Sequence, residues 1–175
     1  MFRTWFERFT DASQFLGHAR DMRPTHAGYY HVTARSIAEE HIFRDNRDYH
    51  AGIQILAELV SANLFACLGF CLMPTHYHLL AWFDERKLSE AIHRLNRRYA
   101  GGFNRRHSRR GHVFDSPFTA VYVQDDVHFR WLDEYIANNP PKRPWPWSSY
   151  DSHFSFVETR EPGSAMPNQV RRASA

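Results

Sequence analysis

The chain has 175 residues and a formal net charge of +3, which is long enough for one buried core and leaves little room for a second domain. No apolar stretch reaches the length of a membrane span, and charged residues interrupt the N-terminal segment, which argues against an ordinary signal peptide. Both cysteines, Cys67 and Cys71, lie in an apolar run, as buried thiols of a reduced compartment do. We therefore expect a cytoplasmic protein with one domain over residues 27–150, an N-terminal extension over residues 1–26, and a disordered tail over residues 151–175.

The first half of the chain alternates between strand and helix patterns. Aromatic and β-branched residues dominate Gly28–Arg35 and predict a first strand. Apolar residues then recur at helical spacing from Tyr49 to Val60 and predict an amphipathic helix. A long apolar run from Asn63 to Phe83 follows, and Pro74 divides it into two strands because proline cannot donate to a sheet ladder.

The second half repeats the helix and strand signals. Helical spacing returns from Leu88 to Phe103, and a fourth strand is predicted within His112–Val123. Asp125 and Asp126 can cap a last helix that runs to Asn138-Asn139. The order β-α-β-β-α-β followed by a helix predicts an α+β fold, with a ferredoxin-like split βαβ antiparallel sheet covered by helices.

Two histidines separated by one residue, His76 and His78, open the second strand of the divided run, in "MPTHYHLL". Alternate residues of a strand share a face, so both imidazoles project in one direction. Two neutral imidazoles are costly to bury unless their nitrogens are satisfied, and a divalent metal satisfies them directly. A pair of surface histidines on a sheet face is the alternative, and the spacing alone favours it.

The last predicted helix carries Tyr135 and Asn139 on one face, because they are four residues apart. Two imidazoles and a carboxamide oxygen suit Mg²⁺ or Mn²⁺ and leave positions open for phosphate oxygens. A tyrosine one turn away can then act as a nucleophile toward a phosphate. In the alternative interpretation, Tyr135 is a core aromatic with its hydroxyl at the rim, in a stripe with Val127 and Trp131, and Asn139 is a helix C-cap.

The segment Ala91–Phe114 holds seven arginines and no acidic residue. The guanidinium groups alternate with aromatic rings, and a single-stranded nucleic-acid groove requires this combination of charge and stacking surface. A solvated basic helix is the alternative, although seven like charges in so short a span favour nucleic acid. The candidate contacts are Arg94, Arg97, Arg98, Arg105, Arg106, Arg109, Arg110 and His112.

Several motifs, in order along the chain, resemble those of the REP-associated tyrosine transposases, a branch of the single-tyrosine HUH transposases. They extend from about Gly28 to Tyr150 and include "YYHVTARS", "CLMPTHYHLL", "YIANNP" and "WPWSSY". In particular, "MPTHYHLL" resembles the family's M-P-N/T-H-x-H-L-L motif, and "YIANNP" resembles its Y-I-x-x-N-P motif. The resemblance implies a ferredoxin-like catalytic domain whose partner is single-stranded or hairpin DNA.

Carried onto this chain, the resemblance makes His76 and His78 the metal-binding pair and Tyr135 the nucleophile. Asn139 falls where related enzymes place a third metal ligand, and the implied cofactor is Mg²⁺ or Mn²⁺. In such chemistry, attack by the tyrosine leaves a 5′-phosphotyrosine and a free 3′-hydroxyl. The basic segment then supplies the DNA contacts.

The sequence departs from the family pattern at Asp115-Ser116-Pro117, where family members usually have glutamine or a similar residue, a glycine and an arginine. The segment between "NNP" and "WPWSSY" is also short. A basic contact to DNA is therefore missing. Two alternatives to strand cleavage and transfer stay open, namely a hairpin-binding protein of the same fold that does not cleave, and an RNA-binding or RNA-processing module. Monomer and dimer also stay open.

Overall fold

The fold is that of a computed structural model, which describes residues 26–115 and 118–158. The predicted N-terminal extension, apart from His26, and Ser116-Pro117 lie outside the described residues. Within them, no helix is long and apolar enough to cross a lipid bilayer. Cys67 and Cys71 are both buried free thiols.

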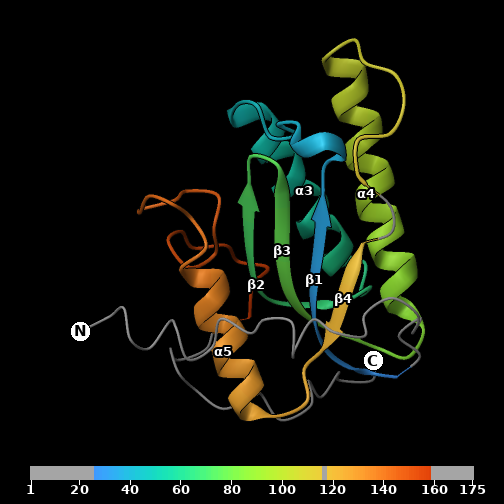
Figure 1. Cartoon of the computed structure of the whole chain (residues 1–175). Helices are drawn as coiled ribbons and strands as arrows, with labels where there is room; N and C mark the ends of the chain where they lie inside the picture. The colour runs from blue at the N-terminus through green and yellow to red at the C-terminus, as the bar shows by residue number, and fades with distance from the viewer. Residues whose placement is uncertain (1–25, 116–117, 159–175) are drawn as a thin grey trace.

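The predicted order of elements is confirmed, with a short 3-10 helix added after the first strand (Figure 1). Gly101 and Gly102 lie inside a helix that continues to Arg106. The elements are β1 (Gly28–Arg35), η1 (Ile37–Glu39), α3 (Asn46–Ser61), β2 (Ala66–Met73), β3 (His76–Phe83), α4 (Lys87–Arg106), β4 (Thr119–Tyr122) and α5 (Asp126–Ala137).

The four strands form one sheet in the order β2-β3-β1-β4, and every neighbouring pair is antiparallel. This is the strand order of the ferredoxin-like split βαβ fold, so the predicted fold class is confirmed. The histidine strand β3 lies at the centre of the sheet beside β1.

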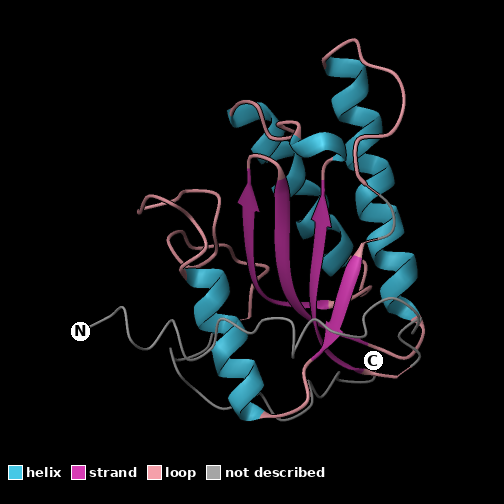
Figure 2. Cartoon of the chain, viewed as in Figure 1, coloured by secondary structure: helices cyan, strands magenta, loops and turns pink. Residues whose placement is uncertain are grey.

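Helices cover both faces of the sheet, with α3 and α4 on one side and α5 on the other (Figure 2). Side chains of β1 alternate between these layers, so that Tyr30 and Val32 pack with the α3 and α4 side while Tyr29 packs with α5. In β3, Leu80 faces α5 and Leu79 faces the other layer. The same alternation therefore directs even-numbered residues of β3 toward α5.

The chain after α5 packs against the outer strand β2. The ring centroids of Phe154 and Phe156 lie 5.0 and 5.8 Å from that of Phe70. The two rings bury apolar surface, so residues 151–158 belong to the packed domain, and the boundary expected at residue 150 is too early. Residues 159–175 lie outside the described part of the chain.

Candidate catalytic and metal-binding site

The two histidines that open β3 project to the α5 side of the sheet. His76 is partly exposed, whereas His78 keeps only 2% of its surface exposed. Their ring centroids lie 5.0 Å apart with the planes at 87°. The hydroxyl oxygen of Thr75 lies 3.0 Å from Nδ1 of His76, which helps to fix that ring. The sequence-based alternative of two surface histidines therefore does not hold for His78.

A third histidine, His31 of β1, lies against His78. Nε2 of His31 is 2.9 Å from Nδ1 of His78, and the two rings stack with centroids 5.1 Å apart. The hydroxyl of Thr33 lies 3.2 Å from the same Nδ1. These contacts engage Nδ1 of His78, while its Nε2 is buried and has no hydrogen-bond partner among the described residues. Sequence reasoning missed His31, because only the pairing of β1 with β3 brings it to the site.

The helix α5 begins where the sequence predicts, because Asp125 is its N-cap. The Asp125 carboxylate accepts a hydrogen bond from the backbone N–H of His128 at 2.8 Å. Asp126 is the first helical residue, which corrects its prediction as an alternative cap. With its start fixed, the helix packs its apolar face on the sheet and carries its last turn over the histidines.

This last turn brings Tyr135 and Asn139 to the histidines. The Tyr135 ring meets the His78 ring edge to face, with centroids 5.6 Å apart, and stacks on Trp131. Tyr135 is 38% exposed and Val127 is 70% exposed, so the stripe considered in the alternative interpretation is not buried along its length. The Asn139 side chain lies within reach of the His76 ring and acts to raise the pKa of that imidazole. The helix C-cap is Asn138, so the capping role considered for Asn139 is wrong.

The site histidines are neutral at ordinary pH because they are buried. Burial, with a smaller contribution from the charge of His128, lowers the pKa of His31 from 6.5 to about 4. Burial and then the charge of Arg35 lower the pKa of His76 to about 4, and the Asn139 side chain, which can accept a hydrogen bond from the protonated ring, opposes this shift. The pKa of His78 is also lowered, chiefly by burial. Neutral imidazole is the form that binds a metal ion.

We expect the free energy of unfolding to fall as the pH is lowered from about 6.5 toward 4. In this window the unfolded chain protonates His31 and His76 while the folded chain does not, so protons favour unfolding. Each such histidine lowers the free energy of unfolding by about 1.4 kcal/mol for each pH unit within this window. Urea unfolding at a series of pH values measures the slope, and His31→Gln should reduce it. A wild-type stability that does not change between about pH 7 and 4.5 would contradict buried neutral histidines.

The donor set fits a divalent metal ion. His76 and His78 supply imidazole nitrogens and Asn139 supplies a carboxamide oxygen, and Mn²⁺ and Mg²⁺ accept such neutral ligands. A metal ion would also satisfy the buried Nε2 of His78, which is otherwise costly. The described residues contain no cluster of three or more His, Cys, Asp and Glu side chains that could hold a metal. Among the described residues, the candidate for a third ligand beside His76 and His78 is therefore the Asn139 carboxamide.

Four of the seven arginines predicted to bind nucleic acid are paired with acidic residues of the protein. The segment itself has no acidic residue, but α3, the loop before it and the first turn of α4 supply them. The Asp48 carboxylate is 3% exposed and also lies 3.0 Å from His107, so its pair with Arg106 holds the end of α4 against α3. The pairs are Arg94 with Glu90, Arg98 with Glu58, Arg106 with Asp45 and Asp48, and Arg109 with Glu40.

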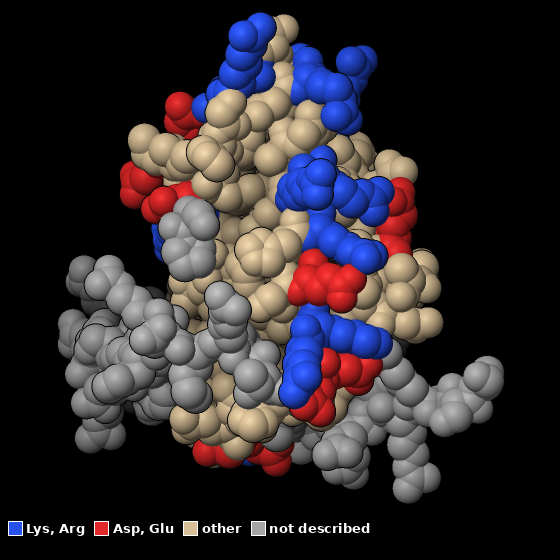
Figure 3. All heavy atoms as spheres, turned by 90° about the vertical axis from the view of Figure 1, so that its right-hand side faces the viewer, with Lys and Arg blue, Asp and Glu red and all other residues tan. Residues whose placement is uncertain are grey.

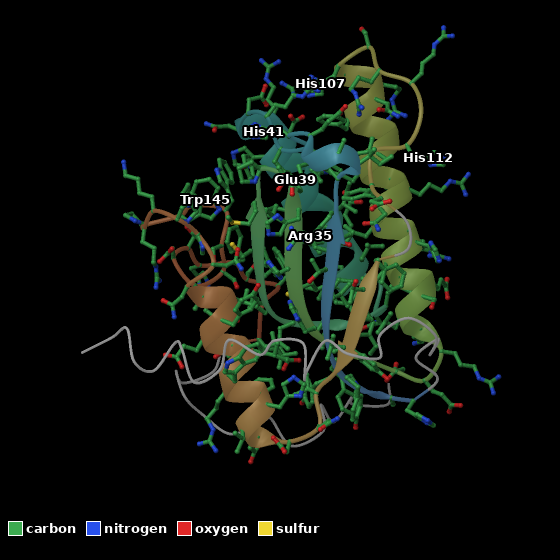
Figure 4. All side chains as sticks on the ribbon, in the orientation of Figure 1. Arg35, Glu39, His41, His107, His112 and Trp145 are labelled. Carbon is green, nitrogen blue, oxygen red and sulfur yellow. The ribbon has the colours of Figure 1, made fainter. Side chains whose placement is uncertain are left out.

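The other three arginines, Arg97, Arg105 and Arg110, are exposed and form no ion pair with a described residue. Figure 3 shows Lys and Arg side chains in a column on this side of the molecule, with acidic side chains between them. His112 is exposed in the loop that runs back along α4 (Figure 4). The column and the histidines lie on opposite faces of the sheet, so the structure does not bring these two predicted groups together.

The comparisons with known proteins give a family and a fold. A family model described as "Transposase IS200 like" matches residues 25–139, which include the three site histidines, Tyr135 and Asn139. Among solved structures, the chain is similar to a REP-associated tyrosine transposase bound to a REP hairpin, with 14% sequence identity and a TM-score of 0.61. The similarity covers 81% of this chain and 97% of that one. No curated protein matches the sequence significantly. At this identity, the structural similarity shows the fold alone.

Proposed function

Because the chain belongs to the IS200-like transposase family, we propose that it cleaves and transfers strands of single-stranded or hairpin DNA, with Tyr135 as the nucleophile. One observation carries this proposal. The partly exposed Tyr135 lies against His78, while the Asn139 side chain, just past the end of the same helix, lies within reach of His76. The proposed nucleophile and the three proposed metal ligands therefore lie together on the α5 side of the sheet.

The proposed roles follow from the chemistry of each group. His76, His78 and Asn139 would hold Mg²⁺ or Mn²⁺, which, when bound, polarises a phosphodiester and offsets the charge that develops on it. The Tyr135 oxygen attacks phosphorus and the bond from phosphorus to the 3′-oxygen breaks, while the phenol releases its proton to solvent and the leaving 3′-oxygen takes one up. The products are a 5′-phosphotyrosine and a free 3′-hydroxyl. One phosphate ester replaces another, so the strand can be rejoined without ATP.

Hairpin DNA is the proposed substrate for two reasons. The structurally similar transposase is bound to a REP hairpin. In this chain, the exposed arginines on and after α4 offer charge for a DNA backbone. The arginines of α4 and the histidines lie on opposite faces of the sheet, and the edge strand β4 lies between them. We propose that the DNA passes this edge between its contacts with α4 and the point of cleavage.

Replacing Arg97, Arg105 and Arg110 together by alanine should weaken DNA binding and flatten its salt dependence. Each phosphate of a single strand that the protein no longer neutralises lowers the log–log slope by about 0.7, so three such phosphates lower it by about 2. Affinities measured at a series of salt concentrations give this slope. Arg98→Ala is the matched control on the same helix and should change the slope less, because Arg98 pairs with Glu58. Equal slopes for the triple variant and the wild type would show that these arginines do not contact DNA.

The proposed activity is tested by a covalent product. DNA hairpins with single-stranded arms of random sequence, labelled on the 3′ side, are incubated with protein and Mn²⁺ and separated on a denaturing gel. Labelled DNA should move at the size of the protein, and matched RNA hairpins should give no such band. Binding without a shifted band would favour the non-cleaving hairpin-binding protein. A band with RNA alone would favour RNA processing.

A further inference from the structure

Arg35, the last residue of β1, lies beside the histidine pair. It is the register partner of His76 across β1 and β3, and like His76 it projects to the α5 side of the sheet. Figure 4 shows it at the end of β1, over the centre of the sheet. The side chain is exposed and forms no ion pair with a described residue. An arginine without an ion pair thus lies next to the proposed metal ligands.

This position is unfavourable for a metal site unless an anion is also present. After burial and the neighbouring histidines, the charge of Arg35 contributes to lowering the pKa of His78, so its field reaches both imidazoles. The same field repels a divalent cation bound by those imidazoles. An anion placed between the guanidinium and the cation would convert this repulsion into two attractions.

The space for such an anion is present. Thr33, Arg35, Asp115 and Thr119 line a cavity of about 140 Å³. Thr33 is the register partner of His78 on one side and of Thr119 on the other, so the cavity lies beside the histidines on the same face. Two hydroxyls and a guanidinium are donors that suit phosphate oxygens. The Asp115 carboxylate, on the β4 side of the cavity, opposes an anion there.

We propose that Arg35 binds the phosphate at which the DNA strand is cleaved, holding it between the guanidinium and the histidine pair, with Thr33 and Thr119 lining its seat. This inference rests on the proposed function and adds the group that positions the scissile phosphate. Arginine suits this role because its planar fork binds two phosphate oxygens at once. Asp115 weakens the same interaction.

The proposal requires that phosphate and metal ion strengthen each other's binding through Arg35. With DNA bound, the anion screens the guanidinium from the cation, so the metal ion binds more tightly. By reciprocity, the metal ion must tighten DNA binding by the same factor. Without DNA, Arg35 only repels the metal ion. Its removal should therefore have opposite effects on the two measurements.

The test uses Tyr135→Phe protein, in which binding is measured without cleavage, with Mn²⁺ and DNA hairpins that carry random single-stranded arms. We expect Mn²⁺ to tighten DNA binding by about fivefold or more, and Arg35→Gln to reduce this gain to about twofold or less. Arg35→Lys should keep part of the gain because it keeps the charge. Arg47→Gln, an exposed position on α3, is the control and should keep all of it.

Calorimetric titration of Mn²⁺ without DNA gives the second measurement, where Arg35→Gln should bind as tightly as the parent or more tightly. Weaker Mn²⁺ binding in this variant would indicate a structural role for Arg35 and overturn the proposal. An unchanged gain in Arg35→Gln, or no gain in the parent, would also overturn it. None of these results depends on the adduct that tests the proposed function.

Asp115→Asn should tighten DNA binding, and weaker binding would contradict a phosphate in this cavity.

Discussion

Replacing Tyr135 by phenylalanine is expected to abolish the covalent protein–DNA adduct while DNA binding stays within about twofold of the wild type. The change removes one oxygen. The ring that remains keeps its stacking on Trp131 and its edge contact with His78, which are contacts of the ring and not of the hydroxyl. Loss of the adduct with unchanged binding would therefore identify the hydroxyl as the attacking group.

The position of the label decides between the two ways of cutting the strand. If the tyrosine attacks, the fragment on the 3′ side of the cut carries the protein through its 5′-phosphate, and a label on that fragment shifts to protein size. If water attacks, the strand is cut and no label shifts. Cleavage without a shifted band, or a band that persists in Tyr135→Phe, would reject the tyrosine mechanism and leave the histidines as part of a hydrolytic site.

Replacing His78 by alanine is expected to lower metal-dependent cleavage by about a thousandfold or more, because the ion supplies several kcal/mol of transition-state stabilisation. His76→Ala should have a comparable effect. DNA binding measured in EDTA should change little in either variant, since the exposed arginines lie on the other face of the sheet. Cleavage by the wild type at its full rate in EDTA would remove the metal from the mechanism.

Asn139→Ala tests the third proposed metal ligand and should lower cleavage less than either histidine substitution. A water molecule can take the place of its carboxamide, so we expect a loss of roughly tenfold in cleavage, partly recovered at high Mn²⁺ concentration. Asn138→Ala is the neighbouring control, since Asn138 caps the helix and its side chain bonds the backbone oxygen of Glu134. Equal effects of the two substitutions would mean that Asn139 acts through the local backbone and not as a metal ligand.

The sequence predicts most of the fold because the signals for each element are local. Strand alternation places His76 and His78 on one face of β3, and helical spacing places Tyr135 and Asn139 on one side of the last helix. A capping residue fixes where α5 begins. The motif resemblance then joins the two pairs. Without it, periodicity alone cannot show that the end of α5 lies over the start of β3, because that contact depends on packing between distant segments.

The parts that the sequence does not predict all depend on contacts between distant segments. His31 and Arg35 reach the site through the register of β1 with β3, which no local pattern encodes. The pairing of Arg106 with Asp48 could not be foreseen either, because the residues are 58 positions apart and the arginine segment contains no acidic residue. A count of like charges in one segment thus overestimates the charge that is free to bind DNA.

The chain that packs against β2 also closes one edge of the sheet. Backbone N–H groups from this segment donate to the outer side of β2, with Glu158 bonding the oxygen of Cys67 at 2.8 Å and Ser149 bonding that of Phe70 at 3.1 Å. The backbone N–H of Leu72 in turn donates to the oxygen of Trp147 at 3.0 Å. An unpaired strand edge is a template on which another strand can add. With β2 covered, a second copy that joined by strand addition would have to use the four-residue strand β4, at the edge the DNA is proposed to pass. Growth of the sheet and binding of the substrate would then compete for the same edge.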